Sequence, residues 1–182
     1  LRDKADKVLR TVDTRQMVYL YAVIKGIEEA AEIEAEPIII GGDAPNAFAA
    51  TGENGERIMA INFAMLDLLG NDMDAAAALI GHELAHLKLN HGEEKKEALQ
   101  RQRGTTFSAA ATKYSRDNER EADYLGVIWA MQAGYDPQGA VRLQEKLYKL
   151  YKSRPGGFSG SHPSSIERIT VLKSLVRRFS PD

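Results

Sequence analysis

Residues 72–92 read DMDAAAALIGHELAHLKLNHG, a stretch with a strongly helical pattern. The four consecutive alanines at 75–78 have the best helix propensity of any residue type. Asp72 and Asp74 precede them, where the positive end of the helix dipole favours acidic side chains. The stretch therefore predicts a helix that begins at Asp72 or Asp74 and runs to about Leu89.

A short motif inside this predicted helix carries the chemistry. His82-Glu83-Leu84-Ala85-His86 places two histidines four positions apart. Residues at that spacing lie about 40° from each other around a helix, so both imidazoles project from one face and can ligate one zinc ion. Glu83 lies about 100° from His82, where its carboxylate can take a proton from a metal-bound water that attacks a carbonyl. The alternative is a helix with two histidines on an ordinary polar face.

A third ligand would decide between these interpretations, and the sequence offers three candidates. His91 lies five positions past His86, about 140° around the helix, so we expect it to point away from the metal face in a structural or surface role. His162 lies in a loop rich in Gly and Ser. The best candidate is an acidic side chain, Glu119.

Glu119 belongs to residues 115–123, which read SRDNEREAD. Glu119 and Asp123 are four positions apart and share one face of a predicted helix. This pair suits a zinc site, because one carboxylate can bind the metal while the other accepts the spare N–H of a ligating histidine. The alternative is an exposed acidic face whose carboxylates pair with Arg116 and Arg120.

The two motifs together resemble those of the HtpX-like and CAAX prenyl protease type metallopeptidases, a branch of the gluzincins. The signature of that family is His-Glu-x-x-His followed by Ser-Arg-x-x-Glu-x-x-Ala-Asp. The matching positions here are His82, Glu83, His86, Ser115, Arg116, Glu119, Ala122 and Asp123. Weaker similarity extends to residues 46–49 (NAFA) and to His162-Pro163 followed by residues 167–169, so the resemblance covers roughly residues 36–178.

The resemblance implies one Zn²⁺ per chain, with Glu119 as the third ligand beside His82 and His86. It also implies that Asp123 supports a ligating histidine, which we predict to be His82. We expect a soluble, single-domain member of the family, because the membrane-spanning helices of the prenyl protease relatives are absent. Residues 1–182 would then form one metallopeptidase domain, with an N-terminal helical segment at 1–35 and a catalytic core at 36–178.

His162 has three possible roles in this scheme. It could be a catalytic residue that stabilises the oxyanion formed when water adds to a carbonyl. It could instead close the fourth position of the zinc ion, or stand next to a helix N-cap without any chemistry. Arg168 and Tyr148 could also supply a positive charge or a hydroxyl group, and the sequence does not rank them.

The rest of the chain predicts an α+β fold that is mostly helical, with a small sheet packed on the active-site helix. Helices are expected at 3–34, 116–133 with Ser115 as a cap, 138–152 and from about Pro163 onward. Strands are expected at 38–40 and 57–62, with turn-rich sequence between them. We expect 57–62 to be an edge strand along the cleft, where it can hold an extended substrate by main-chain hydrogen bonds.

The amino-acid composition limits the kinds of molecule that this chain can bind. The 182 residues carry a formal charge of −2, with 43% hydrophobic and 27% charged side chains, which is typical of a globular protein and argues against nucleic-acid binding. There is no cysteine, so a transition metal must be held by nitrogen and oxygen. No apolar run approaches the roughly 18 residues that cross a bilayer, so membrane association is expected only through a segment upstream of Leu1. The family resemblance favours a bacterial periplasm or cell envelope.

These features predict a zinc-dependent endopeptidase that hydrolyses internal peptide bonds, with polypeptide substrates from unfolded or damaged proteins. The alternative is a module that binds zinc and polypeptides, in the manner of a chaperone, without catalysis. Glu83 argues against that alternative, because a carboxylate at this position has no role in merely holding zinc. The sequence does not determine the oligomeric state.

Overall fold

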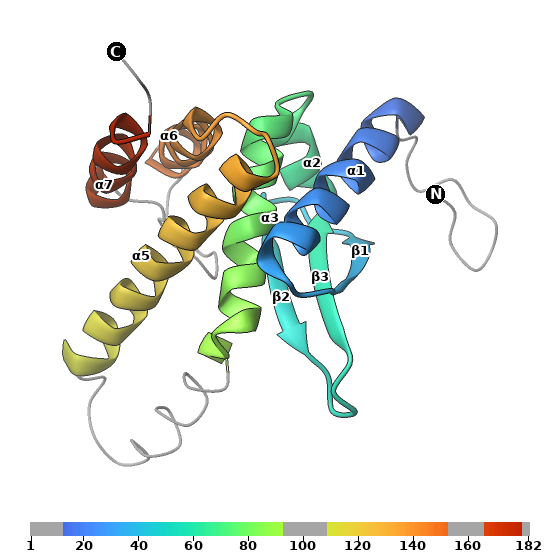
Figure 1. Ribbon diagram of the computed structural model, residues 1–182, viewed down its shortest axis with the longest axis horizontal. Coiled ribbons are helices and arrows are strands. Elements are labelled where there is room, and N and C mark those ends of the chain that lie inside the picture. The colour runs from blue at the N-terminus through green and yellow to red at the C-terminus, as the bar shows by residue number, and fades with distance from the viewer. Residues whose placement is uncertain (1–12, 93–108, 153–165, 180–182) are drawn as a thin grey trace.

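The computed structural model describes residues 13–92, 109–152 and 166–179. The elements in chain order are α1 (Thr14–Ala31), β1 (Glu36–Ile40), β2 (Ala47–Thr51), β3 (Arg57–Asn62), α2 (Phe63–Leu69), α3 (Met73–Lys88), α5 (Ala109–Gln132), α6 (Gln138–Lys152) and α7 (Ile166–Arg177). The described part of the chain is thus mostly helical with one small sheet, which confirms the predicted α+β class (Figure 1).

The sheet has three strands in the order β1-β3-β2. β1 is parallel to β3, with Ile38 opposite Ala60, and β2 is antiparallel to β3, with Phe48 opposite Ala60. The prediction that 57–62 forms an edge strand is therefore wrong, because β3 has a neighbour on both sides. The edge next to α3 is β2, which the sequence analysis missed. Its alanine-rich sequence has little intrinsic strand preference, and pairing with β3 creates the strand.

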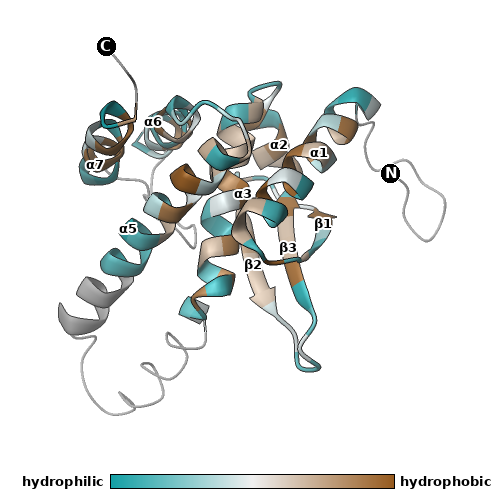
Figure 2. Ribbon diagram, viewed as in Figure 1, coloured by the Kyte–Doolittle hydropathy of each residue, from teal (hydrophilic) through white to brown (hydrophobic). Residues whose placement is uncertain are grey.

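The helix α3 occupies the centre of the fold. It lies between the sheet and α5 in Figure 1, and it contacts α1, α5, α6 and β2. Twelve of its residues are buried, including Ile80 and Leu84 at 1% exposure or less. A helix that is apolar on all sides belongs in a protein interior. In Figure 2, which has the same view as Figure 1, β2 and the middle of β3 are brown and most of the turn that joins them is teal.

The two ends of α3 are fixed in different ways. The Asp72 side chain caps the N-terminus by accepting a hydrogen bond of 3.1 Å from the Ala75 backbone nitrogen. Arg142 of α6 donates two bonds of 2.8 and 2.9 Å to the same carboxylate. At the other end the helix stops at Lys88, and Asn90 adopts a left-handed conformation with φ of 56°. The chain therefore turns sharply just beyond the histidine motif.

The predicted helices differ from the observed ones mainly in length. The first begins at Thr14, where Asp13 accepts a hydrogen bond of 2.8 Å from the Arg15 backbone nitrogen, and it ends at Ala31. The helix predicted for 116–133 is α5, which starts earlier, so Ser115 lies inside the helix and is not its cap.

The helix predicted at 138–152 has the observed bounds of α6. The last helix is described from Ile166, and its predicted start near Pro163 lies outside the described residues, as do positions 3–12 of the first predicted helix.

Candidate metal centre

The helices α3 and α5 cross at two glycines. A Cβ built on Gly126 would lie 2.8 Å from the backbone nitrogen of His82, and one built on Gly81 would lie 2.8 Å from the Gly126 Cα. Residues with side chains could not approach this closely without moving one backbone. Glu119 is seven positions before Gly126, about two helical turns, so both residues face α3. The crossing therefore carries the Glu119 side chain to the histidines.

Three donor atoms converge at this point. His82 Nε2 lies 3.1 Å from His86 Nε2 and 3.4 Å from Glu119 Oε2. His86 Nε2 lies 3.4 Å from Glu119 Oε1. These residues form a group that could hold a metal ion, with all their ligand atoms within 4.8 Å of one another. Zinc bonds of about 2.0–2.1 Å in a tetrahedral arrangement place neighbouring donors about 3.3 Å apart, so the observed separations fit zinc.

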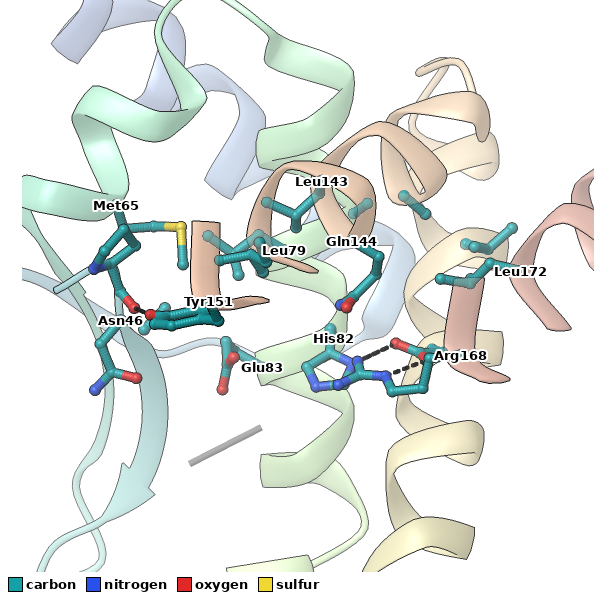
Figure 3. A pocket seen from close by; sticks show the side chains of 17 residues that line it. Asn46, Met65, Leu79, His82, Glu83, Leu143, Gln144, Tyr151, Arg168 and Leu172 are labelled. Carbon is teal, nitrogen blue, oxygen red and sulfur yellow. Dashed lines mark hydrogen bonds and ion pairs between the residues drawn. The ribbon is translucent and has the colours of Figure 1, made fainter. Parts of the chain in front are cut away.

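A carboxylate and a guanidinium stand behind the donors. Asp123 Oδ1 lies 3.0 Å from His82 Nδ1, the ring nitrogen that faces away from the donor cluster. Arg168 of α7 donates to both oxygens of Asp123 at 2.8 and 2.6 Å, and its third nitrogen lies 2.8 Å from Glu119 Oε2. Figure 3 shows Arg168 beside His82, and the dashed lines next to them mark hydrogen bonds and ion pairs of this cluster. Arg168 therefore links the second carboxylate to the acidic donor.

The charged side chains in this buried cluster stabilise one another's ionised forms. Burial disfavours a charged imidazole, but hydrogen bonding to Asp123 and Glu119 outweighs it and raises the pKa of His82 to about 10. Burial also opposes ionisation of Asp123, yet Arg168 and His82 together hold the pKa of that carboxyl below its usual range. Burial likewise disfavours the Arg168 cation, but the charge of Asp123 and its hydrogen bond keep its pKa raised. The cluster thus favours an ionised Asp123 carboxylate beside His82.

His91 lies against the second histidine of the motif. Its Nδ1 is 2.9 Å from His86 Nδ1, and the two rings meet edge to face with centroids 5.0 Å apart. The expectation that His91 points away from the metal face assumed a continuous helix. Because α3 ends at Lys88 and Asn90 is left-handed, the chain folds back and buries His91 to 7% exposure. A surface role is therefore wrong for His91.

Glu83 lies beside the donors on the side of the sheet. Its side chain is among the most buried in the protein, at 2% exposure, and it lines a cavity of about 40 Å³ together with His82. Figure 3 shows Glu83 between His82 and the pair formed by Asn46 and Tyr151. The Tyr151 hydroxyl donates a hydrogen bond of 2.7 Å to the Pro45 carbonyl oxygen, which ties α6 to the start of β2. The cavity is lined by residues of α2, α3, α5, α6 and α7 and by the start of β2.

The remaining predicted residues have different outcomes. His162 lies outside the described residues. Arg168, which the sequence did not rank above Tyr148, contacts both carboxylates of the cluster, whereas Tyr148 does not line the cavity and has the Lys152 ammonium 5.9 Å from its ring. Tyr151 was missed, although its place one turn after Leu147 on the apolar face of α6 could have indicated that it points inward.

Comparisons with known proteins agree with this site. The sequence model for peptidase family M48 matches residues 14–176. The chain therefore belongs to peptidase family M48. The resemblance inferred from the two motifs is confirmed at the level of the family.

Individual relatives share about a quarter to a third of their residues with this chain over the aligned segments. The "Mitochondrial metalloendopeptidase OMA1" of Schizosaccharomyces pombe is 27% identical over 182 residues, covering 87% of this chain and 52% of that protein. The protein of the same name from Arabidopsis thaliana is 32% identical over 112 residues, covering 53% and 23%. The "Beta-barrel assembly-enhancing protease" of Escherichia coli is 24% identical over 173 residues, covering 79% and 34%.

The chain spans about half the length of these relatives or less. None of the described helices is both long enough and apolar enough to cross a membrane.

Proposed function

We propose that this chain is a zinc-dependent endopeptidase that hydrolyses internal peptide bonds of unfolded or damaged proteins. The observation that carries the proposal is the convergence of His82, His86 and Glu119 within 3.1–3.4 Å, with Glu83 buried beside them. His82, His86 and Glu119 would hold one zinc ion. Glu83 would act as the general base.

The donor set is the reason for choosing zinc. Two imidazoles and one carboxylate suit zinc, and they leave a fourth position for water or substrate, as catalytic zinc sites require. The chain has no cysteine that would favour a closed structural site. Zinc held by these three residues would lower the pKa of a bound water to about 7 and would polarise the scissile carbonyl.

Glu83 would then move the proton. It follows His82 directly on the same rigid helix, so its carboxylate is held beside the donors and away from bulk water. It would accept the proton of the attacking water and later deliver it to the leaving amine, a contribution typically worth about 10²–10⁴ in rate.

Asp123 and Arg168 would keep the donors in place. Asp123 Oδ1 lies 3.0 Å from His82 Nδ1 and would accept a hydrogen bond from that nitrogen, which leaves Nε2 of the ring available to the metal. Arg168 holds Asp123 with two hydrogen bonds and also contacts Glu119. These contacts fix the positions of the three side chains relative to one another.

The edge strand β2 would bind the substrate. Within the described residues β2 pairs with β3 on one side, and Asn46 and Ala47 at its start line the cavity with Glu83. An extended peptide could add to the other side of β2 by main-chain hydrogen bonds. A segment must leave its own fold to pair in this way, and this requirement supports unfolded or damaged proteins as the substrate class.

The decisive experiment combines zinc analysis with cleavage of casein, an unfolded protein. We expect about one zinc per chain, and we expect a chelator to abolish cleavage. Glu83→Gln should keep the zinc and lose about 10²–10⁴ of the rate. Glu145→Gln is the matched control, because Glu145 is exposed on α6 and pairs with Lys173 at 2.6 Å. Full cleavage by Glu83→Gln would refute catalysis by Glu83, while bound zinc without any cleavage would favour a polypeptide-binding module.

The single-domain organisation at 1–182, the role of His162 and a location in the bacterial cell envelope stay predictions of the sequence. A His162→Ala variant with unchanged turnover and zinc affinity would remove that residue from the site.

A further inference from the structure

We propose that His91 is a positioning residue for His86, holding that ring in the tautomer and orientation that a metal ligand needs. The inference rests on the proposed zinc site. It starts from the contact of 2.9 Å between the Nδ1 atoms of the two rings. The two ring planes are inclined at 70°, and the two Nδ1 atoms are the ones that lie within hydrogen-bond distance.

The contact between the two Nδ1 atoms determines which ring nitrogens of His86 and His91 carry a proton. His86 Nε2 faces His82 and Glu119, so Nε2 is the nitrogen directed at the metal. A neutral imidazole that ligates through Nε2 carries its proton on Nδ1. That N–H points at His91 Nδ1, which must then accept, and His91 in turn carries its proton on Nε2. This second N–H faces the exposed Glu121 carboxylate, whose Oε2 lies 3.7 Å away.

His91 is not a further ligand in this arrangement. It touches the nitrogen of His86 that is turned away from the donor cluster, and the donor group consists of His82, His86 and Glu119. Its position corresponds to that of Asp123 behind His82, at 3.0 Å from the outer nitrogen of that ring. The two imidazoles of the motif thus have separate supports, a carboxylate for one and a third imidazole for the other.

The backbone explains why His91 can reach back. A continued helix would have carried it about 140° away from His86. Instead α3 stops at Lys88, and Asn90 takes the left-handed conformation that asparagine tolerates better than other residues with a side chain. His91 is then buried against the motif at 7% exposure. The positioning role therefore depends on the turn as well as on the imidazole.

The test measures zinc affinity by chelator competition on the full chain, starting from the metal-free protein. His91→Phe keeps the ring volume and removes the acceptor, so we expect its zinc dissociation constant to rise about 10–100-fold, as for other partners of ligating histidines. His91→Asn keeps an acceptor two bonds from Cβ, so we expect most of the affinity to return. Equal affinities for His91→Phe and the unaltered protein would overturn the inference, and so would equal losses in both variants.

A second pair of variants leaves both rings untouched and covers the case in which His91→Phe does not fold. Asn90→Gly allows the left-handed turn, whereas the β-branched Asn90→Val opposes it. Zinc binding should weaken in Asn90→Val and persist in Asn90→Gly, and no difference between them would count against the proposal.

Proton-detected nitrogen spectra of the zinc-bound protein give an independent readout. They should show His86 with its proton on Nδ1 and His91 with its proton on Nε2, and the opposite assignment would contradict the contact. Failure of the unaltered protein to bind zinc would instead refute the proposed function, so the two failures are distinguishable.

Discussion

Replacement of Gly126 by alanine should separate the two helices that build the metal centre. The new Cβ would lie 2.8 Å from the His82 backbone nitrogen and 3.2 Å from the Ala78 carbonyl oxygen, whereas ordinary contacts begin at 3.4 Å. Both obstacles are backbone atoms, so no side chain can rotate away. The helices must therefore move apart by about 0.6 Å to restore a normal contact.

Two opposing effects determine how much Gly126→Ala changes the free energy of unfolding. Overpacking of this kind costs about 1–3 kcal/mol, while alanine gains about 0.8–1 kcal/mol over glycine in a helix. The net change should be a loss of about 0–2 kcal/mol in the free energy of unfolding. Gly26→Ala is the matched control in α1, because its Cβ would lie 3.6 Å from Ala133 Cβ, which is an ordinary contact. That variant should gain about 0.5–1 kcal/mol.

Urea denaturation of both variants in the metal-free state measures this difference. Zinc affinity supplies the second readout, because ligand distances in a metal site tolerate about 0.2 Å and the expected shift of Glu119 is larger. We expect Gly126→Ala to bind zinc more weakly and Gly26→Ala to bind it normally. A gain in stability for Gly126→Ala equal to that of Gly26→Ala, together with unchanged zinc affinity, would refute the reasoning about the crossing.

Two further predictions concern stability. Hydrogen bonds from Arg142 lower the pKa of Asp72 from 3.8 to about 2, so this stabilisation is complete above pH about 4 and is lost as the pH falls toward 2. Asp72→Asn keeps a capping oxygen but should lose about 1–2 kcal/mol at pH 7 in urea denaturation, since Arg142 is partly exposed, and an equal loss at pH 2 would contradict this origin. Zinc at 100 times its dissociation constant should stabilise the protein by about 2.7 kcal/mol and raise its Tm by about 5–11 °C. Glu119→Gln should remove most of that rise in thermal denaturation, and a full rise would exclude Glu119 as a ligand.

The parts of the site that the sequence could predict are those that lie within one helix. The spacing of His82 and His86, and that of Glu119 and Asp123, places each pair on one helix face through local geometry alone. The mostly helical class also followed from propensity and periodicity. The strand β2 could not be predicted in this way, because Ala47–Thr51 becomes a strand through pairing with β3.

His91 shows where local reasoning fails. Its predicted direction followed from helical geometry, and a single left-handed residue, Asn90, reversed it. Arg168 shows the same limit at longer range, since it is 45 positions from Asp123 and its role depends on how α7 packs against α5.

The sequence by itself determined the donor types, their spacing on two helices and the family to which the motifs point. Only the tertiary structure decided that the two helices approach closely enough for those donors to meet, that β2 forms the edge beside them and that His91 lies behind His86. The physical reason is that helix periodicity acts over a few residues, whereas a close crossing depends on two glycines, Gly81 and Gly126, that are far apart in the chain and in contact in space.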